Sequence, residues 1–153
     1  MTAVPVHEKT FTVSLDLGEG FAQHATFDDS PDIAPVLIDE PAPLGQGSGA
    51  SPTRLLAASV GSCLAASLAH CLRKSRVDLH GVRTKVEGTV ARSERGRLRV
   101  TGFRVLLEPV VPADQHARLG RCVEVFEDFC TVTASVREAI HVEVTVVPTV
   151  PQA

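Results

Sequence analysis

The alternation of hydrophobic and polar residues predicts a β-rich start to the chain. Residues 10–17 alternate cleanly, with the apolar side chains on one face, as a half-buried strand requires. The glycines of residues 18–20 predict a turn, and residues 21–27 are expected to form the returning strand of a hairpin. Residues 28–50 are rich in Pro, Asp and Gly and predict a long loop, with one short strand at 36–39.

A long helix is expected next, over residues 51–75. Ser51 suits the N-cap position and Pro52 suits the first helical position. The segment is apolar almost all round and rich in small residues. This pattern is typical of a central, buried helix that another element approaches closely.

The second half of the chain predicts a hairpin, two helices and a last strand. Strands are expected within residues 80–108, and the apolar phase slips across Gly102, which indicates a β-bulge. Helices are expected over 113–139, followed by a strand at 141–147. With no βαβ repeat, this order predicts an α+β fold with largely antiparallel pairing.

Composition narrows the class of protein. The chain has 153 residues, which suggests a single domain over 1–153. A net charge of −3, no basic stripe and no Trp or Tyr argue against nucleic-acid binding. No apolar run approaches the ~20 residues that span a bilayer, and residues 1–9 lack the apolar core of a secretory signal. We therefore expect a cytoplasmic protein with no membrane partner.

Cysteines carry the candidate chemistry. Cys63 lies in a run of small apolar residues, where a packing role and a redox role both remain open. Cys130 opens a predicted helix, and the amides of a helix N-terminus favour a thiolate. If the fold joins them, the pair has a nucleophilic and a resolving thiol, which suffice to reduce a peroxide without a metal or organic cofactor. Cys71 and Cys122 are expected to be packing residues.

Cysteine spacing gives no sign of a metal site, since no Cys-x-x-Cys pair or zinc-like Cys/His cluster occurs. Cys63 and Cys71 are eight residues apart, and so are Cys122 and Cys130. The sequence alone offers no mechanism for this repeated spacing. In a cytoplasmic protein, the four cysteines are expected to be free, catalytic or metal-binding rather than joined in structural disulfides.

Three stretches resemble the OsmC/Ohr family of thiol-dependent hydroperoxide reductases. They are residues 37–64, including Gly-Ser-Cys at 61–63, then 77–88, and 129–144 with Phe-Cys-Thr-Val-Thr at its start. The resemblance covers roughly residues 10–147. It implies an intertwined homodimer, in which an antiparallel β-sheet wraps around a long central helix and active sites lie at the interface. It also implies that Cys63 is the peroxidatic cysteine and Cys130 the resolving one, with an external dithiol as reductant.

The chain departs from the best-characterised branches of that family, which carry a Glu directly after the helix-starting Pro. Thr53 stands at that position, and no arginine precedes Arg54, so the family's Arg–Glu pair is absent. A buried cysteine without a cationic partner keeps a raised pKa. Arg54, Thr53 and His24 are candidate auxiliary residues. This departure points to a divergent OsmC-like branch.

Two functions follow from the resemblance. The first is a peroxidase for organic or fatty-acid hydroperoxides in oxidative stress defence. The alternative is a binding module that uses the same fold to hold an apolar ligand with little or no turnover. Candidate residues for an apolar pocket wall are Phe21, Phe27, Phe103, Phe126 and Phe129.

Overall fold

The computed structural model describes residues 8–152 and divides the chain into two compact units, residues 1–52 and 53–153. The absence of a secretory signal is predicted from residues 1–9. Residues 1–7 of that stretch lie outside the described part.

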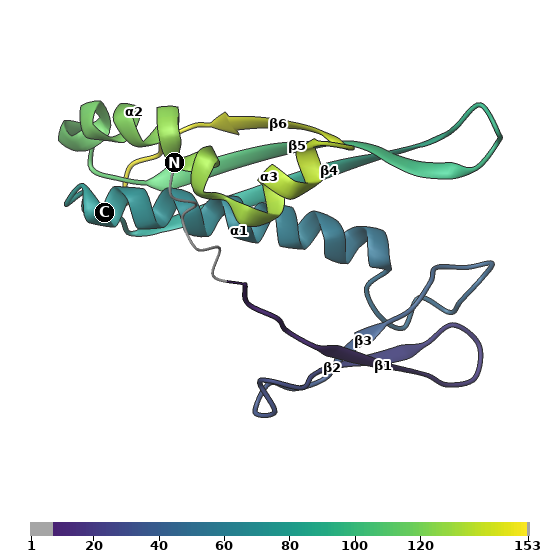
Figure 1. Cartoon of the computed structure of the whole chain (residues 1–153). Helices are drawn as coiled ribbons and strands as arrows, with labels where there is room; N and C mark the ends of the chain where they lie inside the picture. The colour runs from purple at the N-terminus through teal and green to yellow at the C-terminus, as the bar shows by residue number, and fades with distance from the viewer. Residues whose placement is uncertain (1–7, 153) are drawn as a thin grey trace, which may run out of the picture. The chain divides into compact units, whose positions relative to one another are not determined.

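The N-terminal unit is a three-stranded antiparallel sheet, drawn in purple and blue in Figure 1. Strands β1 (Val13–Leu17), β2 (Gln23–Phe27) and β3 (Val36–Ile38) pair in the order β1-β2-β3. These strands lie within the segments that alternation predicts. Every residue of β1 is exposed, and its apolar side chains Val13, Leu15 and Leu17 are only partly covered by the described residues.

A buried carboxylate organises the loop that follows β3. Asp39 is 2 % exposed, and its Oδ2 accepts hydrogen bonds from the backbone N–H groups of Gln46 and Ser48 and from the Ser48 hydroxyl. These bonds hold the pKa of Asp39 below its usual value, with the Ser48 backbone as the largest cause. Gly45 is required here because a Cβ would clash with the Glu40 carbonyl oxygen and with Asp39 Oδ1. The hydrogen bonds to Asp39 therefore fix the conformation of the glycine-rich loop.

The C-terminal unit packs one long helix, α1 (Pro52–Lys74), with a second three-stranded sheet. Figure 1 shows β4 (Gly81–Arg92) and β5 (Leu98–Val110) extending as a long hairpin. The helix lies very close to β4, since a Cβ on Gly61 would be 2.6 Å from Val86 Cγ2. Side chains of α1, β5 and the later helices form one core; its fully buried members include Val60, Leu64, Leu68, Val105, Leu107 and Phe126.

Largely antiparallel pairing is confirmed, since three of the four strand pairings are antiparallel, and the second sheet adds one parallel pair. Strand β6 (His141–Val146) pairs with β5 in parallel, which gives a mixed sheet of order β4-β5-β6. A helical crossover connects the two strands, and such a crossover returns the chain to the start of the neighbouring strand. The predicted bulge is confirmed: Thr89 pairs with Gly102 but Val90 pairs with Val100, so the register shifts beside Gly102.

The crossover between β5 and β6 is more broken than the two helices predicted over 113–139. It consists of the 3-10 turn η1 (Ala113–Gln115), α2 (His116–Val125), the 3-10 turn η2 (Phe126–Phe129) and α3 (Thr131–Arg137). None of these four elements has a side-chain cap hydrogen bond. Short helices are marginal by themselves, so core packing and cross-links must fix this segment.

Helix α1 also corrects a prediction about membranes. At 23 residues it is long and apolar enough to cross a bilayer by length and composition, contrary to the expectation that no such run exists. Leu64, Leu68 and Leu72 are nevertheless fully buried in the core of the unit. A core helix passes the same test of length and composition, so α1 does not indicate a membrane crossing.

Candidate active site

The fold brings Cys63 and Cys130 together. Cys63 is half-buried on α1, about three turns after its start, and Cys130 is fully buried. The side chains of the two cysteines are hydrogen-bonded, and neither is in a disulfide. The two sulfurs therefore lie within the C-terminal unit as a pair of free thiols, which is the proximity that the family resemblance implies.

Cys130 is the N-cap residue of α3, with extended backbone angles of φ −86° and ψ 96°. Its thiol donates to Thr133 Oγ1 at 3.1 Å, and Thr133 is itself fully buried. The buried hydroxyl gives the Cys130 sulfur a defined orientation beside Cys63.

Burial and the neighbouring sulfur raise the pKa of Cys63. Loss of solvation is the largest cause, followed by the hydrogen bond to Cys130 and by repulsion from its charged form. Hydrogen bonds from the backbone N–H groups of Val132 and Thr133 act in the opposite direction and favour the Cys63 thiolate. The net effect is a thiol that holds its proton more firmly than a free cysteine does.

The amides at the start of α3 thus serve a different cysteine from the one expected. Sequence reasoning assigned them to Cys130, because Cys130 opens the helix. The N–H groups of Val132 and Thr133 instead hydrogen-bond Cys63, which approaches the same helix end from α1. The helix that Cys130 caps therefore directs two backbone donors at Cys63.

Arg54 and Thr53 lie away from this pair within the unit. Arg54 precedes Cys63 by nine residues on α1, which places it ~13 Å along the axis and half a turn out of phase. Both residues line a cavity of about 310 Å³ together with Val86, Val90, Val100 and Phe103. The auxiliary role predicted for them at Cys63 gains no support from this placement.

His24 lies in the N-terminal unit, exposed on β2 and paired in register with Leu37 and Asp16. Its auxiliary role stays a prediction.

The phenylalanines predicted to form a pocket wall are dispersed. Phe103 lines the cavity beside Arg54, and Phe126 is fully buried in the core. Phe129 is 73 % exposed, and Phe21 is exposed in the N-terminal unit. One of the five, Phe103, therefore contributes to a cavity in the C-terminal unit, while Phe126 serves packing.

The other two cysteines form a disulfide that the sequence analysis missed. Cys71 of α1 and Cys122 of α2 are bonded, with their Cα atoms 5.7 Å apart. Cys122 is 1 % exposed, as expected for a packing residue, but the expectation that packing is its whole role was wrong. The signal that could have found this bond is the repeated spacing of eight residues.

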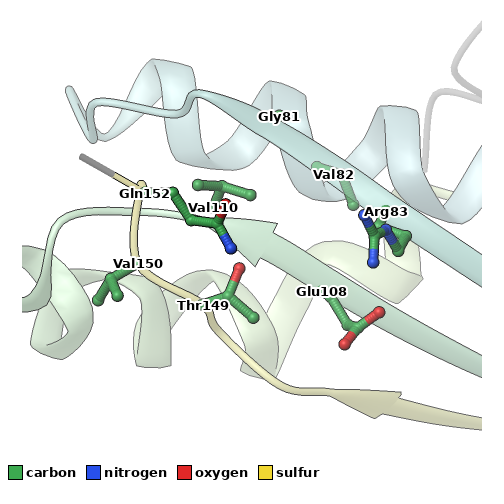
Figure 2. Close-up of a pocket in the computed structure, with 8 residues that line it drawn as sticks. All are labelled: Gly81, Val82, Arg83, Glu108, Val110, Thr149, Val150 and Gln152. Atoms are coloured by element: carbon green, nitrogen blue, oxygen red, sulfur yellow. The ribbon is translucent and has the colours of Figure 1, made fainter.

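A second cavity, of about 590 Å³, lies at the far end of the β4–β5 hairpin from its turn (Figure 2). Arg83 and Glu108 reach toward it from adjacent strands, and Thr149 and Gln152 border it from the C-terminal segment. No cysteine lines this cavity, so its volume alone does not connect it with the dithiol. Within residues 8–152, no group of three or more His, Cys, Asp or Glu side chains is arranged to hold a metal ion.

Comparison with known proteins places this geometry in a family. The sequence model of the OsmC-like protein family matches residues 45–145, which include α1, both cysteine pairs and most of the second sheet. The chain therefore belongs to the OsmC-like family. Comparison with curated proteins gives no match.

Solved structures share the fold at low sequence identity. An OsmC-like protein of unknown function from Vibrio cholerae has a TM-score of 0.77 at 16 % identity, over 92 % of this chain and 100 % of that one. The organic hydroperoxide resistance protein OsmC of Legionella pneumophila gives 0.70 at 17 %, over 90 % and 96 %. The organic hydroperoxide resistance protein OhrB of Bacillus subtilis gives 0.67 at 19 %, over 91 % and 98 %.

Proposed function

We propose that this chain is a thiol-dependent peroxidase that reduces organic or fatty-acid hydroperoxides through a Cys63/Cys130 dithiol–disulfide cycle. The supporting observation is the hydrogen-bonded pair of free cysteines, with two backbone N–H groups directed at Cys63. Neighbours of the same fold are named for hydroperoxide resistance, which is consistent with this activity. Such a cycle serves oxidative stress defence.

The proposed cycle reduces the peroxide, resolves the sulfenic acid and then reduces the disulfide, and it needs no metal or organic cofactor. The Cys63 thiolate attacks the O–O bond of the hydroperoxide; an S–O bond forms, and the alkoxide leaves and takes a proton as the alcohol. The Cys130 sulfur then attacks the Cys63 sulfenic acid, so that an S–S bond forms and water leaves. An external dithiol reduces the new disulfide and returns both thiols.

Cys63 is the proposed peroxidatic residue because it is the more accessible of the two. Cys63 is half-buried whereas Cys130 is fully buried, so a substrate from solvent reaches Cys63 first. The N–H groups of Val132 and Thr133 also stabilise negative charge on Cys63 in the attacking state.

A homodimer is proposed as the working form, with the active sites at its interface. Apolar side chains exposed in the described chain support it: several residues of α1, such as Leu55, Leu56 and Cys63, are half-buried and not fully covered. Phe11, Leu15 and Leu17 are also mostly exposed. Exposed apolar surface of this kind marks an interaction site, and a second copy would cover it and close an apolar pocket for the substrate.

The alternative function is a binding module for an apolar ligand, with little or no turnover. The raised pKa of Cys63 favours it. Among the described residues, none of the groups that shift this pKa is an arginine or a lysine. A thiol without a cationic partner is a weak nucleophile near neutral pH.

A turnover assay separates the two functions. Dithiol-dependent consumption of cumene hydroperoxide and a fatty-acid hydroperoxide would be measured against hydrogen peroxide. The peroxidase predicts faster turnover of the organic substrates, its loss in Cys63→Ser, and a trapped sulfenic acid or mixed disulfide in Cys130→Ser. Normal multiple turnover by either variant would refute the two-cysteine cycle and leave ligand binding as the better account.

The proposed place of action is the cytoplasm, as the sequence predicts. The Cys71–Cys122 disulfide argues against a cytoplasmic location, because structural disulfides are uncommon in reducing compartments. Fractionation of cells that express the full chain would decide the location, and alkylation before lysis would report whether this disulfide exists there.

A further inference from the structure

The two cysteine pairs connect the same two segments, one as a disulfide and the other as a contact between free thiols. Cys63 and Cys71 lie on α1, and their partners Cys130 and Cys122 lie on the crossover between β5 and β6. The partners follow in opposite order along the chain, so the segments run antiparallel. The equal spacing of eight residues is consistent with two contacts between antiparallel segments.

The Cys71–Cys122 disulfide is too far from Cys63 to exchange with it directly. Eight residues of α-helix separate Cys63 and Cys71 by ~12 Å along the axis. Thiol–disulfide exchange needs contact between the attacking sulfur and the disulfide. The disulfide can therefore act on the dithiol only through the position of the segment that it anchors.

Apart from the disulfide, core packing and a few hydrogen bonds, such as that from the Asp78 N–H to Gln115 Oε1, hold that segment. Its helices and turns have no side-chain caps, and α3 has seven residues. One ion pair, Arg137 with Glu127, links α3 to η2. The disulfide and the buried side chains of Leu119 and Phe126 tie the same segment to α1 and the core.

We propose that the Cys71–Cys122 disulfide is a clamp that holds Cys130 in register with Cys63 and thereby sets how fast the Cys63 sulfenic acid is resolved. The proposal rests on the proposed function, and it makes Cys71 and Cys122 positioning residues. In the resolving step the Cys63 S–O bond breaks, the Cys63–Cys130 S–S bond forms and water leaves. The clamp is neither made nor broken.

The test removes the clamp in two chemically different ways. Cys71→Ser/Cys122→Ser deletes the bond with polar replacements, and Cys71→Val/Cys122→Ala deletes it with apolar ones. Rapid-quench mass spectrometry after one equivalent of cumene hydroperoxide would follow the sulfenic acid, trapped with dimedone, and the Cys63–Cys130 disulfide. We expect sulfenic acid to form within about twofold of the wild-type rate. The disulfide should form at least about tenfold more slowly, since misplacement of reacting groups by an ångström costs one to two orders of magnitude.

Two further measurements separate positioning from misfolding and from a failed peroxidase. Wild-type chain with the clamp selectively reduced, and far-UV circular dichroism unchanged, should show the same slow resolution. Diamide, a chemical oxidant of dithiols, couples Cys63 with Cys130 without any peroxidase step, and this coupling should be slowed equally. Equal coupling rates with and without the clamp would overturn the proposal. No reaction with peroxide, together with clamp-dependent coupling by diamide, would refute the peroxidase but support the clamp.

Discussion

The side chain of Cys63 is hydrogen-bonded to that of Cys130, the residue that caps α3. One contact therefore sets both halves of the proposed chemistry. It presents a resolving thiol to Cys63, and it brings the first free N–H groups of α3 to the same sulfur. It also raises the pKa of Cys63, so proximity to the resolving thiol opposes activation of the nucleophile.

The reactivity of Cys63 should therefore depend on pH and on Cys130. At neutral pH the raised pKa predicts alkylation by iodoacetamide more slowly than that of free cysteine, with a rate that continues to rise at pH values where free cysteine has levelled off. Cys130→Ala removes the sulfur hydrogen bond and the repulsion, so the pKa of Cys63 should fall and its alkylation at neutral pH should accelerate. An unchanged or higher apparent pKa in this variant would contradict the assignment of causes.

The hydroxyl of Thr133 should matter for both stability and resolution. Thr133→Val keeps the shape of this buried residue but leaves the Cys130 thiol without its partner at 3.1 Å. We expect a loss of about 1 kcal/mol in the free energy of unfolding and slower formation of the Cys63–Cys130 disulfide. Urea unfolding and quenched peroxide reactions would measure the two effects. Thr133→Ser, which keeps the hydroxyl, should retain the wild-type resolution rate; equal slowing in both variants would rule out the hydrogen bond as the cause.

Close packing of α1 against β4 predicts intolerance at one glycine. An alanine Cβ at position 61 would lie 2.6 Å from Val86 Cγ2 and 3.2 Å from Thr84 Cγ2. Gly61→Ala should therefore cost about 1–3 kcal/mol in the free energy of unfolding, and a second change, Val86→Ala, should recover part of the loss. The matched control is Gly120→Ala on α2, where a Cβ meets nothing within 4 Å. The control should be neutral or stabilising by up to about 1 kcal/mol; similar costs at both glycines would disprove the packing argument.

The clamp should also stabilise the fold. Its two cysteines are 51 residues apart, and closing a loop of that length in the unfolded chain is worth up to about 4 kcal/mol in the chain-entropy estimate. Guanidinium unfolding of Cys63→Ser/Cys130→Ser, with and without dithiothreitol, isolates this one bond. The midpoint should fall on reduction. A midpoint indifferent to reductant would mean that the clamp does not contribute to stability.

Local pattern predicted most of the architecture. The strands, the long helix with its Ser51-Pro52 start and the bulge beside Gly102 depend on neighbouring residues, which the sequence displays directly. The parallel placement of β6 depends on the path of the crossover, and no local pattern encodes that path. The one parallel pair, β5 with β6, was not foreseen for that reason, while the largely antiparallel expectation holds for the other three pairs.

The proximity of Cys63 and Cys130 could be expected in advance, but the hydrogen bonds around them and the second cysteine pair could not. A family resemblance supplied Cys63 and Cys130 as partners. Two features depend on the relative direction of α1 and the crossover. One is the hydrogen bonding of Cys63 by the amides of α3, and the other is the bond between Cys71 and Cys122. Arg54 is different, because its nine-residue offset from Cys63 already places it on the opposite face of α1. Helical geometry alone could therefore have excluded Arg54 as a direct neighbour of Cys63.

Mass mapping after peroxide tests the central claim most directly. Protein with Cys63 and Cys130 reduced and the clamp intact would receive one equivalent of an organic hydroperoxide, and its intact mass and non-reduced peptides would be analysed. The proposed cycle predicts the loss of two hydrogens and a new Cys63–Cys130 peptide beside the unchanged Cys71–Cys122 peptide. An unchanged mass, or slow oxygen addition spread over several residues without that link, would contradict the dithiol mechanism.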